Sequence, residues 1–292
     1  MIKLLALDLD GTTLDPQGRI TESVREAIRE AENAGVLVTI ATGRRFRDAR
    51  PVGIDLELNA PLITHNGALI KFAESFETTA VSLLRPETCL EVIRSGRSLG
   101  CDPLVSVDPH GLGTLLYDRV SDDNIPLKKY LRWAESLHGE GPGRDGVVHV
   151  DSLEDVVSDN EVVHISFSGP CAAMKDLEVE LRETLVDRAT NLATIYPHLD
   201  FTLLDILPPD ASKGHGVRQL AEIHSLEAEN VMAIGDNFND LEMLEYAGTA
   251  VVMGNSDPAL QERSGFYTTA SNSADGVAVA IGQFILGNSS HE

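Results

Sequence analysis

Aromatic residues and cysteines are scarce in this chain of 292 residues. Phe, Trp and Tyr together make up 5% of it, so its hydrophobic cores must be built mainly from Leu, Val, Ile and Ala. The three cysteines, Cys89, Cys101 and Cys171, are an odd number and do not have the spacing of metal ligands. This pattern predicts free, buried thiols.

Positive charge and long apolar stretches are also rare. The chain has 23 basic and 46 acidic residues, a formal charge of -23, which argues against a partner such as a nucleic acid or an anionic membrane. A site for a small anion would therefore need its own cations or a bound metal. No apolar stretch is long enough to span a bilayer, and only four apolar residues separate Lys3 from Asp8, so we expect no signal peptide and a cytoplasmic protein.

The hydrophobic pattern is that of a globular α/β protein. The apolar run from Ile2 to Leu7 is typical of a strand buried on both faces of a parallel sheet, and Asp8, Asp10 and Gly11 follow it. Strands and helices then alternate. We expect helices over residues 21–34, 213–223 and 274–286, strands over 36–41, 61–64, 231–234 and 250–253, and a hairpin at Asn66-Gly67.

The length predicts two domains, because it exceeds the size at which one core keeps growing. The middle of the chain has short strands in adjacent pairs with helices between them, which favours a mixed sheet covered by helices. We therefore expect a doubly wound, parallel-sheet (Rossmann-like) α/β core over residues 1–83 and 208–292. Residues 84–207 would form an inserted α/β domain. The strand over residues 201–207 fits either domain.

Polar groups gather where three of the buried strands end. Asp8 and Asp10 follow the first strand, Thr42 and Gly43 the second, and Asp236 to Asp240 a later one. Parallel strands place such ends at one edge of a sheet, where ligands bind. Lys213, at the start of a helix, adds a cation.

Together these groups suit phosphoryl transfer. Carboxylate and carbonyl oxygens are the ligands of Mg²⁺, and Thr42, Gly43 and Lys213 could hold phosphate oxygens. Asp8 could then attack phosphorus while Asp10 moves protons. Two carboxylates in one extended strand would point to opposite faces, so the chain must turn after Leu9, and Gly11 suits that turn.

Four motifs carry a resemblance to a known family. Asp8-Leu9-Asp10-Gly11-Thr12, Thr42-Gly43-Arg44, Lys213-Gly214 and Gly235-Asp236-Asn237-Phe238-Asn239-Asp240 resemble, in the usual order, those of the haloacid-dehalogenase-like superfamily. The large insertion between the second and third motifs is similar to that of its Cof-type sugar-phosphatase branch. The dehalogenases have no acid at the second position of the first motif, so Asp10 favours the phosphatases.

The resemblance implies a role for each motif residue. Asp8 would be the nucleophile and Asp10 the general acid/base. Asp8, the main-chain carbonyl of Asp10, and Asp236 would bind Mg²⁺, and Asp240 would support the metal or Lys213. Thr42, Gly43, Lys213 and Asn239 would contact phosphate. Residues 84–207 would be the cap that closes over the site and selects the leaving group.

Several alternatives stay open. Arg44 could bind substrate anions or pair with a surface acid, and Asn66 is a minor candidate for the substrate rim. Mn²⁺ uses similar ligands to Mg²⁺. The expected activity is hydrolysis of small phosphorylated metabolites, sugar phosphates first, by a monomer or small homo-oligomer. A phosphomutase and a non-catalytic phosphometabolite-binding protein are the alternatives.

Overall fold

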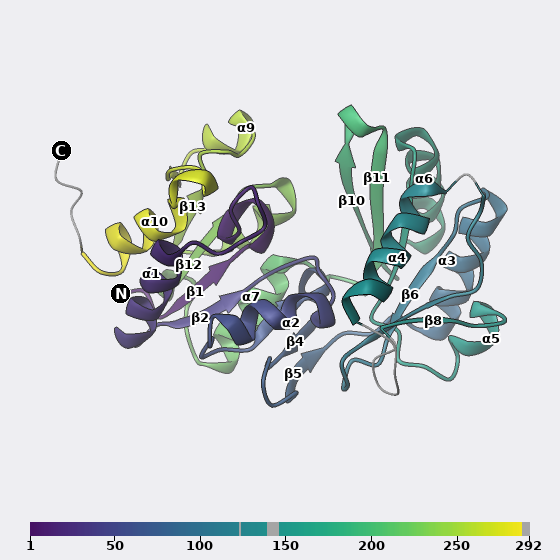
Figure 1. Cartoon of the computed structure of the whole chain (residues 1–292), viewed down its shortest axis with the longest axis horizontal. Helices are drawn as coiled ribbons and strands as arrows, with labels where there is room; N and C mark the ends of the chain where they lie inside the picture. The colour runs from purple at the N-terminus through teal and green to yellow at the C-terminus, as the bar shows by residue number, and fades with distance from the viewer. Residues whose placement is uncertain (123, 139–145, 288–292) are drawn as a thin grey trace. The chain divides into compact units, whose positions relative to one another are not determined.

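A computed structural model describes residues 1–122, 124–138 and 146–287, which fall into two compact units (Figure 1). The first unit comprises residues 1–44, 48–79 and the chain from Ser212 onward, and the second comprises residues 45–47 and 80–211. The middle of the sequence is thus inserted into the fold formed by its two ends.

The first unit is built on a five-stranded parallel sheet. Its strands are β1 (Leu4–Leu7), β2 (Leu37–Ile40), β12 (Val231–Gly235), β13 (Thr249–Val252) and β14 (Phe266–Thr268), in the order β14-β13-β12-β1-β2. All four neighbouring pairs are parallel. Every residue of β1 and β12 is buried, because these strands lie inside the sheet and helices cover them.

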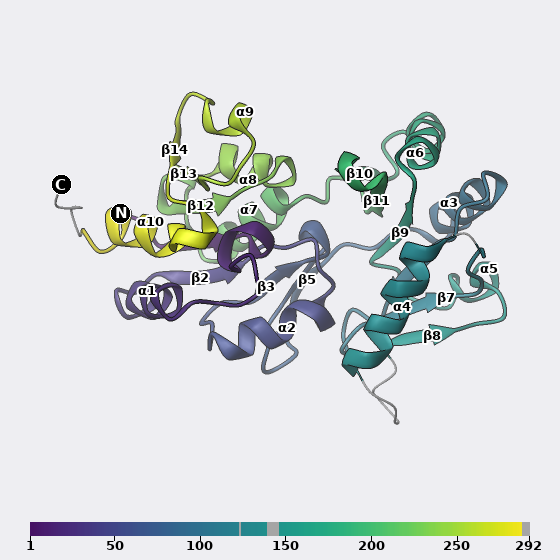
Figure 2. The ribbon, with the colours of Figure 1, turned by 45° about the horizontal axis from the view of Figure 1, so that its top comes forward.

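Four helices of this unit pack as two pairs, α1 (Glu22–Asn33) with α10 (Gly276–Phe284) and α7 (Lys213–Ile223) with α8 (Leu241–Tyr246) (Figure 2). Helix α1 also contacts β2, while α8 contacts β12 and β13. Thr21 caps α1 with its hydroxyl, which accepts a hydrogen bond from the amide of Val24. The short helix α9 (Pro258–Gln261) precedes β14, and α2 (Phe46–Asp55) continues through Pro51.

A small three-stranded sheet lies at the end of the first unit. It contains β3 (Leu62–Thr64), β4 (Leu69–Lys71) and β5 (Thr78–Val81), and β3 and β4 pair antiparallel. The last two residues of β5 group with the second unit, and a parallel bridge from Ala41 to Ile63 joins the sheet to the end of β2. The turn between β3 and β4 contains Asn66, so the predicted hairpin is confirmed.

The second unit is a six-stranded mixed sheet with helices. Its strand order is β10-β11-β9-β6-β7-β8, and only β7 and β8 are paired in parallel. The strands are β6 (Leu104–Val107), β7 (Thr114–Tyr117), β8 (Val147–His149), β9 (His164–Gly169), β10 (Thr190–Tyr196) and β11 (Phe201–Leu207), and the helices are α3 (Pro86–Ser98), α4 (Ile125–His138), α5 (Leu153–Val156) and α6 (Cys171–Leu185). Because β11 pairs with β9 and β10, the strand that fitted either domain belongs to this unit.

The predicted fold class, a parallel α/β core with an inserted mixed-sheet α/β domain, is confirmed. The pattern did not indicate β5 or β14, which are short edge strands with little apolar burial. All three cysteines are free, although Cys171 is only half-buried. Within the described ranges, no helix has the length and apolar character that crossing a bilayer requires.

Candidate active site

The chain turns sharply after β1, as the spacing of Asp8 and Asp10 requires. Residues Leu9–Thr13 form a tight turn in which Asp10 and Gly11 have non-helical backbone angles, with φ +84° at Gly11. A side chain on Gly11 would be strained there, and its Cβ would collide with the carboxylate of Asp236. The hydroxyl of Thr13 donates to the carbonyl of Asp8 over 2.6 Å and closes the turn.

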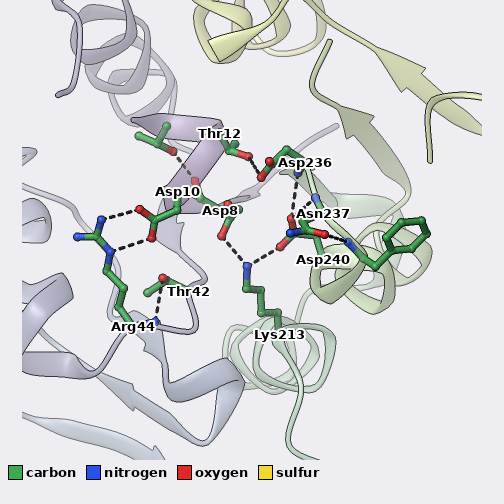
Figure 3. A network of polar contacts seen from close by, with 11 residues as sticks. Asp8, Asp10, Thr12, Thr42, Arg44, Lys213, Asp236, Asn237 and Asp240 are labelled. Atoms are coloured by element: carbon green, nitrogen blue, oxygen red, sulfur yellow. Dashed lines mark hydrogen bonds and ion pairs between the residues drawn. The ribbon is translucent and has the colours of Figure 1, made fainter. Parts of the chain in front are cut away.

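Lys213 contacts residues from both ends of the sequence, beside the carboxyl ends of the inner strands β1 and β12 (Figure 3). Its Nζ lies 2.5 Å from Oδ1 of Asp8 and 2.5 Å from Oδ1 of Asp240. The ammonium is buried at the first residue of α7, and Ser212 caps this helix by accepting a hydrogen bond from the amide of His215. Lys213 is thereby held against both carboxylates.

The loop after β12 is organised by Asp240. Its Oδ2 accepts hydrogen bonds from the amides of Asp236 (2.9 Å) and Asn237 (3.0 Å), while its Oδ1 binds Lys213. Asp240 is fully buried, and any side chain at Gly235 would strike its carboxylate. Asp240 therefore braces the loop, whereas Asp236 accepts a side-chain hydrogen bond from Thr12 over 3.1 Å.

Three carboxylates share this small volume with the ammonium of Lys213. Burial, and then the charge of Asp240, raises the pKa of Asp8 well above its usual value, although Lys213 opposes the shift. The same two causes raise the pKa of Asp236 to about 6. Burial works against the charge on Lys213, but Asp240 and Asp8 outweigh it and raise its pKa. The cluster thus holds more negative charge than its ammonium balances.

These residues fit a divalent cation. Side-chain oxygens of Asp8, Asp236 and Asp240 all lie within 4.8 Å of one another, and hard carboxylate oxygens are what Mg²⁺ binds. The raised pKa values of Asp8 and Asp236 also favour a cation site. A cation beside these two residues would stabilise their ionised carboxylates against burial and the charge of Asp240. Asp240 already uses both oxygens within the protein, which leaves Asp8 and Asp236 as the better ligands.

The second motif lies beside this cluster in the same unit. Thr42 is buried, and its hydroxyl accepts a hydrogen bond from the amide of Arg44 over 3.1 Å. The hairpin turn supports the loop, since the amide of Asn66 donates to the carbonyl of Thr42 over 3.0 Å. A Cβ on Gly43 would lie 3.0 Å from Oδ1 of Asn66, so Gly43 allows this close approach.

Arg44 contacts the carboxylate of Asp10. Its Nε donates to Oδ2 over 2.8 Å and its Nη2 donates to Oδ1 over 2.6 Å, as Figure 3 shows. Both side chains are partly exposed, at 34% for Arg44 and 59% for Asp10. The partner of Arg44 is thus the second carboxylate of the first motif, which lies outside the cluster of Asp8, Asp236, Asp240 and Lys213.

A family model for haloacid dehalogenase-like hydrolases matches residues 5–281. The chain belongs to this family. It is 31% identical over 302 residues to the putative phosphatase YxeH of Bacillus subtilis (strain 168), covering 98% of this chain and 99% of that one. It is 29% identical over 294 residues to the 5-amino-6-(5-phospho-D-ribitylamino)uracil phosphatase YwtE of the same organism, covering 98% and 99%.

The likeness includes the inserted domain. The crystal structure of a haloacid dehalogenase-like hydrolase from Bacteroides thetaiotaomicron has the same fold with a TM-score of 0.79. The two chains are 24% identical, and the match covers 98% of this chain and 100% of that one. The prediction of this family, in its Cof-type branch with a large α/β insertion, is confirmed.

All of the predicted site residues lie in the first unit of this family member. Asp8, Asp236, Asp240 and Lys213 form one contact network, and Asp10 and Arg44 form another. Asn239 is linked to neither by a hydrogen bond. Its Oδ1 is buried and accepts no hydrogen bond from any described residue, an unfavourable state that a hydrogen-bond donor or a cation would relieve.

Two residues near the site were missed from the sequence. Thr12 belongs to the first motif, which implies no role for it, yet its hydroxyl donates a hydrogen bond to Asp236 and orients that side chain. Asn255 lies after β13, and its Nδ2 donates to the carbonyl of Gly11 over 2.9 Å. Its position two residues after Met253, at the end of another parallel strand, is a signal that could have found it.

Proposed function

We propose that the chain is a Mg²⁺-dependent phosphatase of small phosphorylated metabolites, with sugar phosphates as the first candidates. The observation that carries this proposal is the buried Lys213 ammonium, 2.5 Å from both Asp8 and Asp240, beside a third carboxylate on Asp236. A divalent cation would balance the excess negative charge of such a cluster and so allow an anionic phosphate to approach it. YwtE, one of the relatives named above, is a phosphatase of 5-amino-6-(5-phospho-D-ribitylamino)uracil, a small phosphorylated metabolite.

In this proposal Asp8 is the nucleophile. Lys213 binds one oxygen of Asp8, favours the ionised form of this carboxyl group and orients its other oxygen toward phosphorus. Attack forms an aspartyl-phosphate as the bond from phosphorus to the leaving oxygen breaks, and Asp10 gives that oxygen a proton. Water then attacks the phosphorus, Asp10 takes its proton, and the bond to Asp8 breaks to release phosphate.

The remaining motif residues hold the phosphoryl group and the metal. We assign the phosphate oxygens to the hydroxyl of Thr42, the amide of Gly43, Lys213 and the side chain of Asn239. Asp8, the main-chain carbonyl of Asp10, and Asp236 would hold Mg²⁺, with Asp240 supporting Lys213. When bound, Mg²⁺ supplies the positive charge that lets an anionic carboxylate approach an anionic phosphate. Mn²⁺ suits the same oxygen ligands.

We assign the choice of leaving group to the inserted domain, predicted over residues 84–207. The support is topological, because the insertion interrupts the core between the second and third motifs while every motif residue lies in the first unit.

The test is release of inorganic phosphate from a panel of phosphorylated metabolites and p-nitrophenyl phosphate, with Mg²⁺ and with a chelator. We expect release with Mg²⁺ and its loss with the chelator. Mg²⁺ should also raise the melting temperature of the wild type and have much less effect on Asp236→Asn. A protein that hydrolyses nothing on the panel contradicts the proposal, and isomerisation of a sugar phosphate without phosphate release identifies a phosphomutase.

A further inference from the structure

The pair of Arg44 and Asp10 has a geometry that ordinary surface ion pairs lack. Nε and Nη2 of the guanidinium face the two carboxylate oxygens over 2.8 and 2.6 Å. Two parallel N–H···O hydrogen bonds between planar groups fix the plane of the carboxylate as well as its position. A single-point contact, such as a lysine provides, would leave the carboxylate free to rotate.

Arg44 is itself anchored at its backbone. Its amide donates to the hydroxyl of Thr42 over 3.1 Å, and its carbonyl accepts from the amide of His65 over 2.9 Å. Asp10 lies in the turn after β1, whose backbone Thr13 closes. The ion pair therefore joins two loops with fixed main chains, and its orientation is set from both sides.

Within the described part of the chain, no other hydrogen bond or ion pair holds the Asp10 side chain. Asp8 has Lys213, and Asp236 has Thr12, but the carboxylate of Asp10 has Arg44 as its hydrogen-bond partner. With 59% of its side chain exposed, Asp10 also lacks the packing that would select a rotamer. Removing Arg44 would therefore let the Asp10 carboxylate sample several orientations.

We propose that Arg44 is the positioning residue of the general acid/base, holding the carboxyl group of Asp10 in the plane from which it exchanges a proton with the leaving oxygen. The inference rests on the proposed function, which gives Asp10 that role. The ion pair leaves a place for the proton that Asp10 must carry before the first step, because each oxygen of Asp10 has two lone pairs and the guanidinium uses one of each. The proton leaves Asp10 as the bond from phosphorus to the leaving oxygen breaks, and it returns from water in the second step.

The leaving group provides a way to see this role. An alkyl phosphate, such as a sugar phosphate, needs a proton on its departing alkoxide, whereas p-nitrophenyl phosphate loses a stable phenolate without one. The ratio kcat/KM includes only the steps up to cleavage of the bond to the leaving group. Misplacing the general acid therefore lowers kcat/KM for the alkyl phosphate far more than for the aryl phosphate.

The experiment compares wild type, Arg44→Lys and Arg44→Ala on p-nitrophenyl phosphate and on glucose 6-phosphate, or the panel sugar phosphate that is hydrolysed fastest. For Arg44→Ala we expect kcat/KM to fall at least about tenfold more for the sugar phosphate, as a general acid contributes about 10²- to 10⁴-fold. Arg44→Lys should recover only part of this difference, because lysine cannot fix the carboxylate plane.

Arg25→Ala is the matched control. Arg25 forms an ion pair of similar exposure with Asp55 (2.8 Å) and a hydrogen bond to the Asp55 carbonyl (2.7 Å), between α1 and the end of α2. Its variant should keep wild-type kcat/KM on both substrates. An equal loss on both substrates in Arg44→Ala would overturn the inference and assign Arg44 to phosphate binding. A wild type inactive on both substrates contradicts the proposed function instead.

Discussion

Lys213 has two carboxylate partners, and this determines what happens when Asp8 is replaced. In Asp8→Asn the ammonium keeps its 2.5 Å contact with Asp240, so the buried charge is not left unpaired. The change also removes a carboxylate whose pKa is raised by burial and repulsion. We expect turnover to fall by more than about 10³-fold while the melting temperature stays level or rises. Phosphate-release assays and thermal unfolding check this, and an active Asp8→Asn would rule out Asp8 as the nucleophile.

Asp236 predicts an unusual pH dependence of stability. Its pKa is raised from 3.8 to about 6 in the folded protein, so between these pH values the unfolded chain has already released a proton that the folded chain retains. The free energy of unfolding of the metal-free protein therefore falls as the pH rises through this window. We expect the difference in unfolding free energy between wild type and Asp236→Asn, from urea titrations at pH 4 to 7, to show the fall. A pH-independent difference would contradict this assignment.

Single residues differ in how far sequence alone could place them. Asp8 and Asp236 could be brought together because each directly follows a buried strand and parallel strands end at a common edge. The partner of Arg44 could not be chosen, since it depends on the direction in which the turn after β1 sends Asp10. Side-chain pairs across two loops depend on backbone angles that residue types determine only weakly.

At the scale of elements, the turn Leu9–Thr13 is braced by the end of the chain. Asn255 donates to the carbonyl of Gly11, Asn272 donates to the carbonyl of Leu14 over 2.8 Å, and the amide of Asn272 donates to Oδ1 of Asn255. These hydrogen bonds connect the loops after β13 and β14 to the turn that carries Asp10. The carboxyl-terminal part of the chain therefore braces the turn that carries Asp10, the proposed general acid/base, whereas Arg44 of the second motif contacts the Asp10 side chain itself.

Removing this brace should lower activity more than stability. For Asn255→Ala we expect the loss of two exposed hydrogen bonds to cost about 1 kcal/mol of unfolding free energy, with a fall in kcat of about tenfold or more because the turn becomes mobile. Asn230→Ala is the control. Asn230 also makes two loop hydrogen bonds, with Met1 and Glu227, but it lies before the start of β12, whereas the site residues follow the end of that strand. Equal kcat values for the two variants would show that the brace has only a structural role.

The elements that could be predicted are those with a strong apolar period or clear caps. Helix α7 has the predicted bounds of residues 213 and 223, because Ser212 caps it and its buried residues follow a helical spacing. The missed strands β5 and β14 are three or four residues long and only partly buried, so they show neither an apolar run nor clear alternation. These segments are strands because they pair with a neighbouring strand. The local hydrophobic pattern gives no information about such pairing.

At the scale of the whole molecule, the insertion could be predicted from the change in pattern. Strands with helical crossovers give a parallel sheet in the first unit, whereas strands in adjacent pairs give the mainly antiparallel sheet of the second. The exact limits of the units could not be predicted. Residues 45–47, next to Arg44, group with the second unit, although they continue the chain of the second motif.

The net charge of -23 predicts that salt raises kcat/KM for an anionic substrate. In an enzyme whose charge attracts anions, salt would lower it. Long-range repulsion slows the approach of a phosphate dianion, and salt screens it, since the Debye length falls from about 30 Å at 0.01 M to about 8 Å at 0.15 M. At saturating Mg²⁺ we therefore expect kcat/KM for a sugar phosphate to rise with NaCl over this range.

Phosphoethanolamine is the matched probe for this effect, because its ammonium group cancels part of the phosphate charge and leaves less repulsion to be screened. Provided that it is hydrolysed, its kcat/KM should rise less with NaCl than that of the sugar phosphate. If kcat/KM for the sugar phosphate instead falls steeply with salt, local cations such as Lys213 and the bound metal dominate the field at the site, and the overall charge does not control substrate capture.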